Sequence, residues 1–313
     1  MSTPRLDANA RGVFVIAATP FTDAGVVDYA SLDRLLEFYL DRGVHGLTLL
    51  GMMGEAHKLT HAESEGIVRH ALQRVDGRVP VVVGVSGTSL EQMHALTRVA
   101  MGDGACGVMV APTAGLRTDD QIAAYVHAVC DALGDVPIVY QDYPPTTSVW
   151  LSLSLWSRLV TAHPQIVMLK AEDTPGLDKL TRIRDAERRG EYRRTSLAVG
   201  NGGIFLPQSL ARGADAIMTG FGFPEMLVDV YTRHIAGDAD GAEDCYDRYL
   251  PLVSYEQQPG FGLAVRKEVL RRRGVIAHAG VRAPGPRLTP TDHAELTRLL
   301  ARLEARLGRP LTA

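Results

Sequence analysis

The sequence has few of the features that mark disulfide-rich or membrane-spanning proteins. Its 313 residues include three cysteines, Cys106, Cys130 and Cys245, which are far apart and form no CxxC pair. We therefore expect neither a disulfide framework nor a cysteine metal site, and a reduced cytoplasmic setting fits best. Apolar runs such as VPVVVGV (Val79–Val85) are much shorter than a membrane span, and MSTPRLDANAR at the start lacks the apolar run of a secretory signal.

The sequence also lacks an excess of either charge. Its net charge is −3, so a polyanionic partner is not indicated and nucleic-acid binding is not expected. Apolar residues make up 46% and charged residues 22%, the usual balance of a soluble globular protein. There is no internal repeat of fixed period and no low-complexity tract. The length suggests one large domain or two small ones.

What the sequence does contain is a regular alternation of short apolar runs and longer helical patterns. Each run is continuously apolar, as expected for strands that are covered on both faces. The predicted strands are residues 13–18, 46–50, 80–85, 107–111, 137–141, 166–170, 196–200 and 216–220. Helical spacing between them is clearest at Leu32, Leu35, Leu36 and Tyr39 and at Ile122, Tyr125, Val126 and Val129. Glycines that suit the left-handed end of a helix follow such segments at Gly43, Gly77, Gly104 and Gly213.

This alternation predicts the α/β class and a (β/α)8 TIM barrel, because eight βα units follow one another between residues 13 and 220. A doubly wound open sheet is the alternative, but it would not need eight evenly spaced units. After Pro224 the strand patterns stop, and helices are predicted over residues 226–236, 242–255, 262–273 and 292–307. We therefore expect a barrel over residues 1–236 and a C-terminal helical extension, packed on the barrel, over residues 237–313.

The stretch IVMLKAEDTPG (Ile166–Gly176) raises the main functional question, because a buried-looking strand ends on Lys170. Lys170 could reach solvent or pair with Glu172 or Asp173. Alternatively, it could be a desolvated amine that attacks a carbonyl group. In a barrel the C-terminal strand ends build the site, so the fold places Lys170 in the pocket. Apolar walls would disfavour its charged form, and a neutral amine can form a Schiff base with a ketone or aldehyde.

The second predicted strand leads into GMMGE, where Gly51 and Gly54 flank Met52 and Met53, and Glu55 follows. Glycines there let backbone N–H groups turn toward a carboxylate or phosphate. The alternative is a plain βα turn.

Two histidines, His57 and His61, follow at the spacing of a zinc-binding helix. Lys58 stands where a metalloprotease has its glutamate, so we expect a pair of histidines without metal.

Three further strand ends carry weaker signals. VYQDYP (Val139–Pro144) contains Tyr140, Asp142 and Tyr143, which can move protons, although tyrosines at strand ends more often serve packing. GNGG (Gly200–Gly203) and TGFGFP (Thr219–Pro224) carry neither Lys nor Arg, so tight turns or close approach of a substrate are favoured over a phosphate site.

Together these features resemble the dihydrodipicolinate synthase / N-acetylneuraminate lyase superfamily of pyruvate-type Schiff-base lyases. The resemblance covers the opening GVFVIAATPFTDAGVVD, the GxxGE loop, the turn ending in Pro144, and Lys170, in matching order and spacing. It implies a (β/α)8 barrel with a C-terminal helical extension, usually a homotetramer, with no metal or organic cofactor. It also implies that Lys170 is the Schiff-base lysine and that Gly51 to Glu55 hold the keto-acid carboxylate, chiefly by backbone N–H groups.

The sequence departs from the family pattern at several positions. Met52 and Met53 stand where the family usually has the hydroxyl pair of a proton relay. An ungapped count from Pro144 puts Gln141 in the place of the family tyrosine and Asp142 in that of the asparagine, whereas a one-residue bulge would restore Tyr140. Thr146 replaces the arginine of the lysine-biosynthesis synthases, which argues against true dihydrodipicolinate synthase activity.

One branch of the superfamily shares these departures. The segments VYQDYP, LKAEDTPG, AIMTGFGFPE and RYLPLVSYEQQPG resemble the 2-keto-3-deoxy sugar acid dehydratases, the L-2-keto-3-deoxyarabonate type in particular. The loop of that branch does not read GMMGE. We expect a lyase that forms a Schiff base with a pyruvate-type 2-keto acid, and specifically a 2-keto-3-deoxy sugar acid dehydratase or aldolase. The alternatives are a synthase-like pyruvate condensation, a phosphosugar-binding barrel enzyme and a non-catalytic keto-acid-binding barrel.

The site expected from the sequence needs only a small-molecule keto acid as partner, with no nucleic acid, membrane, metal or cofactor. Its catalytic residues are Lys170, Tyr140, Gln141 and Tyr143. Its substrate-binding residues are Gly51, Met52, Met53, Gly54, Glu55, Asp142, Glu172, Gly200, Asn201, Thr219 and Gly220.

Overall fold

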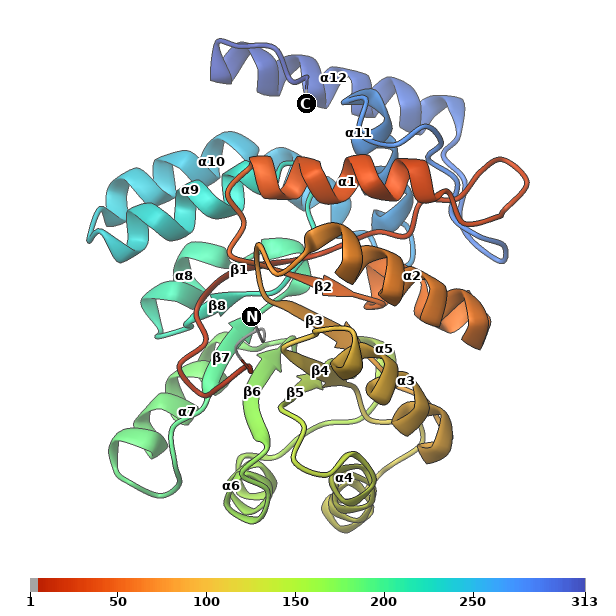
Figure 1. Ribbon diagram of the computed structural model, residues 1–313. Coiled ribbons are helices and arrows are strands. Elements are labelled where there is room, and N and C mark those ends of the chain that lie inside the picture. Colours follow the sequence, from red (N-terminus) through yellow and green to blue (C-terminus); the bar gives the residue numbers. More distant parts are fainter. Residues whose placement is uncertain (1–4, 313) are drawn as a thin grey trace.

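The computed structural model, which describes residues 5–312, contains a closed barrel of eight parallel strands in sequential order (Figure 1). The strands are β1 Gly12–Ile16, β2 Gly46–Leu49, β3 Val81–Gly84, β4 Gly107–Val110, β5 Ile138–Asp142, β6 Ile166–Ala171, β7 Ser196–Val199 and β8 Ala216–Ile217. Because β8 pairs with β1, the sheet has no edge. The predicted TIM barrel is confirmed, and the alternative of an open doubly wound sheet is wrong. Residues 1–4 of the expected barrel segment and residue 313 lie outside the described residues.

Helices surround the barrel and continue beyond it. The barrel helices are α1 Tyr29–Asp41, α2 His61–Val75, α3 Leu90–Gly102, α4 Asp119–Leu133, α5 Pro144–Thr147, α6 Leu153–Ala162, α7 Leu177–Arg188, α8 Leu206–Ala211 and α9 Pro224–Ile235. The extension contains α10 Ala239–Glu256, α11 Gly262–Arg272 and α12 Pro290–Leu307. Short 3-10 turns occur at η1 Met52–Gly54, η2 Ala56–Lys58 and η3 Asn201–Gly203. Within residues 5–312, no helix is both long and apolar enough to cross a membrane.

The local signals in the sequence explain where most helices begin and end. Helix α1 buries the predicted face formed by Leu32, Leu35, Leu36 and Tyr39 against the barrel. Helix α2 starts with a capping box in which Thr60 and Glu63 satisfy each other's backbone N–H groups. The predicted glycines at helix ends all have positive φ, at Gly43, Gly77, Gly104 and Gly213.

The eighth strand is shorter than predicted. We expected it to run from residue 216 to residue 220, but β8 ends at Ile217. Beyond Ile217, the backbone N–H of Met218 still donates to the carbonyl of Val199, and the N–H of Ile16 donates to the carbonyl of Thr219 at 3.0 Å. At Gly220 the side chain of Met53 fills the position that a Cβ would take, and at Gly222 the side chain of Val269 does so. The segment after β8 therefore packs closely against these side chains instead of continuing the strand pairing.

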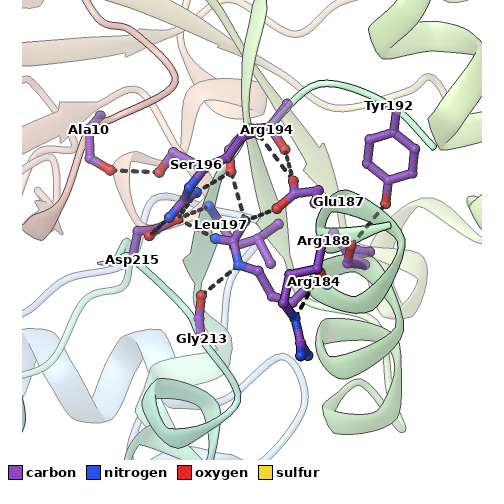
Figure 2. A network of polar contacts seen from close by, with 12 residues as sticks. Ala10, Arg184, Glu187, Arg188, Tyr192, Arg194, Ser196, Leu197, Gly213 and Asp215 are labelled. Atoms are coloured by element: carbon purple, nitrogen blue, oxygen red, sulfur yellow. Dashed lines mark hydrogen bonds and ion pairs between the residues drawn. The ribbon is translucent and has the colours of Figure 1, made fainter. Parts of the chain in front are cut away.

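Charged side chains close the barrel at the N-terminal ends of β7 and β8. Figure 2 shows Asp215, just before β8, facing Arg184 of α7 and Arg194, and both arginines form ion pairs with it. The same carboxylate accepts the backbone N–H of Leu197 in β7 at 2.9 Å. In TIM barrels this end serves stability, whereas the C-terminal strand ends carry the site. This network of ion pairs therefore lies at the end of the barrel opposite to the expected site.

The extension is tied to the barrel by apolar packing and by two buried ion pairs on α11. Helix α10 packs along α9, as Figure 1 shows. Nζ of Lys267 lies 2.6 Å from Oε1 of Glu55, and both side chains are completely buried. Next to it on α11, Nε of Arg266 donates to Oε2 of Glu256 at 2.7 Å. Because Glu55 belongs to the loop after β2, the first pair links that loop directly to the extension.

Loss of the Lys267–Glu55 pair should destabilise the protein strongly. The substitution Lys267→Met leaves the buried Glu55 carboxylate without its main counter-ion, and we expect the free energy of unfolding to fall by about 3 kcal/mol. Arg271→Met is the matched control, because Arg271 is half exposed and its partner Glu268 is also held by Arg272. The control should change the free energy by less than about 1 kcal/mol in urea unfolding. Equal effects of the two substitutions would contradict this role of Lys267.

The Glu256 carboxyl should make stability depend on pH. Burial raises its pKa from 4.5 to about 7, although the neighbouring Arg266 opposes the shift. Between these two pH values the unfolded chain loses this proton and the folded chain keeps it, so the free energy of unfolding falls as pH rises. Relative to Glu256→Gln, the wild type should lose about 3 kcal/mol between pH 4.5 and pH 7.5. A difference between the two proteins that stays constant over this range would refute the assignment.

Candidate active site

Lys170 lies inside the barrel near the C-terminal end of β6. It is in register with Gln141 of β5 and Ala198 of β7, and registered residues of neighbouring parallel strands point to the same side of the sheet. The Lys170 residue is 2% exposed. Lys170 therefore lies at the strand end predicted from the sequence, with its side chain buried and facing the barrel interior.

The surroundings of Lys170 differ from the apolar walls that we expected. Its Nζ donates to Oε2 of Glu172 at 2.7 Å, and Glu172 is itself 5% exposed. The pairing with Glu172 that the sequence analysis considered as one alternative is present, because a buried polar group needs a hydrogen-bond partner. Lys170 is thus both desolvated and paired, which combines the two alternatives drawn from the sequence.

Glu172 holds three strand ends together. Its Oε2 also accepts Nε2 of Gln141 at 2.7 Å, and its Oε1 accepts the backbone N–H of Asn201 at 3.0 Å. The amide of Asn201 donates back to the Glu172 carbonyl at 3.3 Å. A Cβ on Gly200 would lie 2.1 Å from Oε1 of Glu172, so glycine is required for the carboxylate to sit there. Gly200, Asn201 and Gln141, all predicted site residues, are therefore brought together around Glu172.

Tyr140 faces away from Lys170. Its neighbour Gln141 points inward, so alternation turns Tyr140 outward, where its ring packs 6.3 Å from that of Trp156 on α6. Its hydroxyl has no hydrogen-bond partner among the described residues, and burial raises its pKa far above the usual value. The register between β5 and β6 does shift between Ile138 and Val139, but the extra residue is Val167 of β6, so Tyr140 stays outside the barrel. The ungapped count that gives Gln141 the inward position is the one that the structure follows.

Asp142 and Tyr143 have different surroundings. Asp142 is buried and pairs with Nζ of Lys179 on α7 at 2.6 Å, so its carboxylate is engaged by the helix layer. Burial raises the pKa of Asp142 to about 6, and the Lys179 ammonium opposes the shift. Tyr143 is half-buried just before α5. Burial raises the pKa of its hydroxyl, and the nearby Glu172 carboxylate raises it further. Of the tyrosines, Tyr143 is therefore the one electrostatically coupled to the Lys170 pair.

The loop after β2 forms the short turn η1, which is fixed from both sides. The hydroxyl of Thr19 donates to the carbonyl of Gly54 at 2.7 Å. Met53 is buried against Gly220, where a Cβ would collide with its sulfur at 1.6 Å. A Cβ on Gly51 would lie 2.9 Å from Cγ2 of Ile16. Met52 is half-buried. The turn thus sits over β1 and β8, at the same end of the barrel as Lys170.

Glu55 closes this turn with its side chain directed toward the extension. Its carboxylate accepts from Lys267, from Lys58 at 3.0 Å, and from the backbone N–H of Arg282 at 2.9 Å. Its own N–H donates to the carbonyl of Met52 at 3.1 Å. Both groups that could have bound a substrate are therefore engaged within the protein. Thr219 is buried and holds the Ile16 N–H through its carbonyl.

The sequence analysis missed the contribution of α11. Lys267 and Arg266 come from the extension, far along the chain from the barrel loops that they contact. A signal for Lys267 exists in the sequence, since it lies three residues after the buried Ala264 and so falls on the apolar face of its helix. His57 and His61 do not converge on a metal site. Among residues 5–312, no group of three or more His, Cys, Asp or Glu side chains is placed to hold a metal ion.

Comparison with known proteins gives consistent matches. Residues 9–305 match the dihydrodipicolinate synthetase family. The chain is 34% identical over 307 residues to L-2-keto-3-deoxyarabonate dehydratase of Azospirillum brasilense, covering 97% of this chain and 96% of that protein. It is 32% identical to 4-hydroxy-tetrahydrodipicolinate synthase of Sorangium cellulosum, covering 94% and 96%.

Solved structures agree. A crystal structure of dihydrodipicolinate synthase from Rhodopseudomonas palustris superposes with a TM-score of 0.93 and 45% identity, covering 96% of this chain and 99% of that one. A second, a dihydrodipicolinate synthetase-like protein from Pseudomonas aeruginosa, has a TM-score of 0.85 at 25% identity and covers 94% and 99%. The fold, the barrel-end lysine and the matched length lead to one conclusion: the chain belongs to the dihydrodipicolinate synthetase family of lyases and synthases.

Proposed function

We propose that the protein is a 2-keto-3-deoxy sugar acid dehydratase that works through a Schiff base on Lys170. The observation that carries this proposal is the hydrogen bond between the buried Nζ of Lys170 and the Glu172 carboxylate. A neutral amine is the nucleophile in Schiff-base formation, and a carboxylate at this distance can take and return its proton. The resemblance to the Azospirillum brasilense dehydratase supports the substrate class.

The first half of the proposed reaction builds the covalent intermediate. Glu172 accepts a proton from the Lys170 ammonium, and the free amine attacks the C2 ketone of the substrate. The resulting carbinolamine loses its hydroxyl as water, taking the proton back from Glu172. The iminium ion that remains withdraws electrons from C3. The substrate carboxylate at C1 would lie toward the η1 turn, which remains the predicted carboxylate site.

The second half removes water from the substrate. Glu172, again a carboxylate, removes a proton from C3 and gives an enamine. The C4 hydroxyl leaves as water with that proton, which yields a C3–C4 double bond conjugated to the iminium. A shift of hydrogen turns the C5 carbinol into an aldehyde, and hydrolysis releases the keto-semialdehyde and the Lys170 amine. Tyr143, close to Glu172, is the group proposed to assist proton transfer at C4.

Pyruvate condensation of the synthase type is the second candidate. The 45% identity to the Rhodopseudomonas palustris structure favours it. Met52 and Met53 in place of hydroxyl residues, the outward Tyr140 and the absence of an arginine at Thr146 favour the dehydratase. Both reactions share the same covalent intermediate on Lys170, so product analysis must separate them.

Trapping the Schiff base tests the shared step. The chain has only four lysines, Lys58, Lys170, Lys179 and Lys267, and the other three are paired with acidic residues. Borohydride reduction in the presence of pyruvate should add one pyruvate-derived group to Lys170, as located by peptide mass spectrometry. Lys170→Ala should form no such adduct, and Lys179→Ala is the matched control that keeps it. An adduct at another lysine, or none with saturating ligand, would overturn the proposal.

Replacing the carboxylate tests the role of Glu172. Glu172→Gln cannot accept a proton, so kcat for dehydration of a five-carbon 2-keto-3-deoxy sugar acid should fall by about 10²- to 10⁴-fold. Asp173→Asn is the control, because Asp173 is the next residue and pairs with Lys179 instead of Lys170. The control should keep a kcat near that of the wild type, with semialdehyde formation as the readout. A Glu172→Gln enzyme of wild-type activity would exclude Glu172 as the proton carrier.

A further inference from the structure

The turn after β7 is enclosed from the side of the extension by polar groups that have no role in the mechanism above. A Cβ on Gly202 would lie 1.9 Å from Nε2 of Gln257 and 2.6 Å from a terminal nitrogen of Arg266. Gly202 has φ of +61°, a conformation that glycine adopts without strain. Because residue 202 is glycine, two hydrogen-bond donors from the extension, on Gln257 and Arg266, occupy the space that a side chain would fill.

These donors lie on the far side of the same turn that contacts Glu172. Gly200 and Asn201 touch the carboxylate, and Gly202 touches Gln257 and Arg266. Gly202 is two positions after Gly200, so their Cα atoms are at most about 7.6 Å apart. Tyr143 is within electrostatic reach of both Glu172 and Arg266. The turn over residues 200–202 therefore lies between the Glu172 carboxylate beside Lys170 and the pair from the extension.

The donors are also incompletely satisfied within the protein. Nε2 of Gln257 is buried and finds no acceptor among residues 5–312. A buried amide donor without a partner is costly, and such a donor at a site commonly serves a ligand or an ordered water. The Arg266 side chain is 13% exposed, and its Nε is used by Glu256. Its terminal nitrogen at Gly202 is turned toward the turn, not toward Glu256.

We infer that Arg266 and Gln257 form the subsite for the hydroxylated far end of the substrate. This inference rests on the proposed function and specifies its substrate class. An open-chain keto acid bound at Lys170 extends its distal carbons past this turn toward these donors, whereas the three carbons of pyruvate end short of them. Hydroxyl groups on those distal carbons accept hydrogen bonds from the guanidinium and the amide.

The charge balance of the pair selects between two kinds of sugar acid. At pH 8, above the pKa of about 7 of the completely buried Glu256, its carboxylate neutralises Arg266, so the subsite then offers donors without net positive charge. A second carboxylate at the distal end of the substrate would find no free counter-charge there, and desolvating it would be unfavourable. The subsite therefore favours a monoacid with distal hydroxyls over a keto diacid.

Binding to a set of single variants tests this subsite. The half-saturating concentration in borohydride trapping is measured at pH 8 for pyruvate and for a six-carbon 2-keto-3-deoxy aldonic acid. Gln257→Ala and Arg266→Lys should raise the value for the sugar acid by about tenfold, the loss of one or two hydrogen bonds to a charged or buried donor. The value for pyruvate should stay unchanged. Gln258→Ala is the matched control, because Gln258 is exposed, and it should change neither value.

Calorimetric titration of the sugar acid into the same variants, made also in the Lys170→Ala background, separates the two proposals. If the wild type forms no adduct on Lys170 but Arg266→Lys still weakens binding of the sugar acid, the Schiff-base function is refuted and the subsite is retained. Equal losses for pyruvate and sugar acid, or no loss for either, overturn the subsite.

Removing the negative charge of Glu256 tests the preference for a monoacid. Glu256→Gln keeps a hydrogen-bond acceptor for Arg266 but frees its positive charge, so a six-carbon keto diacid should bind more tightly to this variant than to the wild type. Wild-type protein that binds the diacid more tightly than the monoacid overturns the assignment.

Discussion

The buried carboxylate of Glu172 determines the geometry at the C-terminal end of the barrel. A carboxylate removed from water must be satisfied by donors, and Glu172 obtains them from Lys170, Gln141 and the Asn201 backbone. These donors come from three neighbouring strand ends, so the positions of β5, β6 and the turn after β7 are fixed together. Gly200 follows from the same requirement, since a side chain there would displace the carboxylate. The amine of Lys170 is thereby held in one place at the centre of the site.

The extension supplies a second layer of fixed charges behind this centre. Lys267 holds the loop after β2 through Glu55, and Arg266, paired with Glu256, lies against Gly202 in the turn after β7. Both residues are neighbours on α11, so one short helix positions two loops on different sides of the barrel. The ion pairs around Asp215 lie at the other end of β7 and β8, where they close the barrel without touching the site (Figure 2). The ion pairs around Asp215 therefore stabilise the end of the barrel that lies away from the site.

Local patterns in the sequence predict the barrel almost completely. Continuous apolar runs reveal all the strands because both faces of a parallel barrel strand are buried, and glycines mark the helix ends because only they take positive φ without strain. Lys170 is also predictable, since the strand order places its end at the site. Tyr140 shows where such reasoning fails. Which residue of β5 faces inward depends on a pairing register between strands, and Gln141 is fixed by its partner Lys170 rather than by its own neighbours. The pairs made by Glu55 and Glu256 are long-range or lie within the extension, so spacing along the chain did not reveal them. The predicted boundary at residues 236 and 237 remains a prediction.

The fully buried contact between Glu55 and Lys267 has a consequence for how such proteins diversify. Its two halves are separated by most of the chain, yet neither is tolerable alone in a dry interior. Genetic exchange that swapped the C-terminal segment between distant relatives would succeed only where both halves were inherited together. The turn that ends in Glu55 and the helix α11 that carries Lys267 are therefore expected to be inherited together as one linked pair.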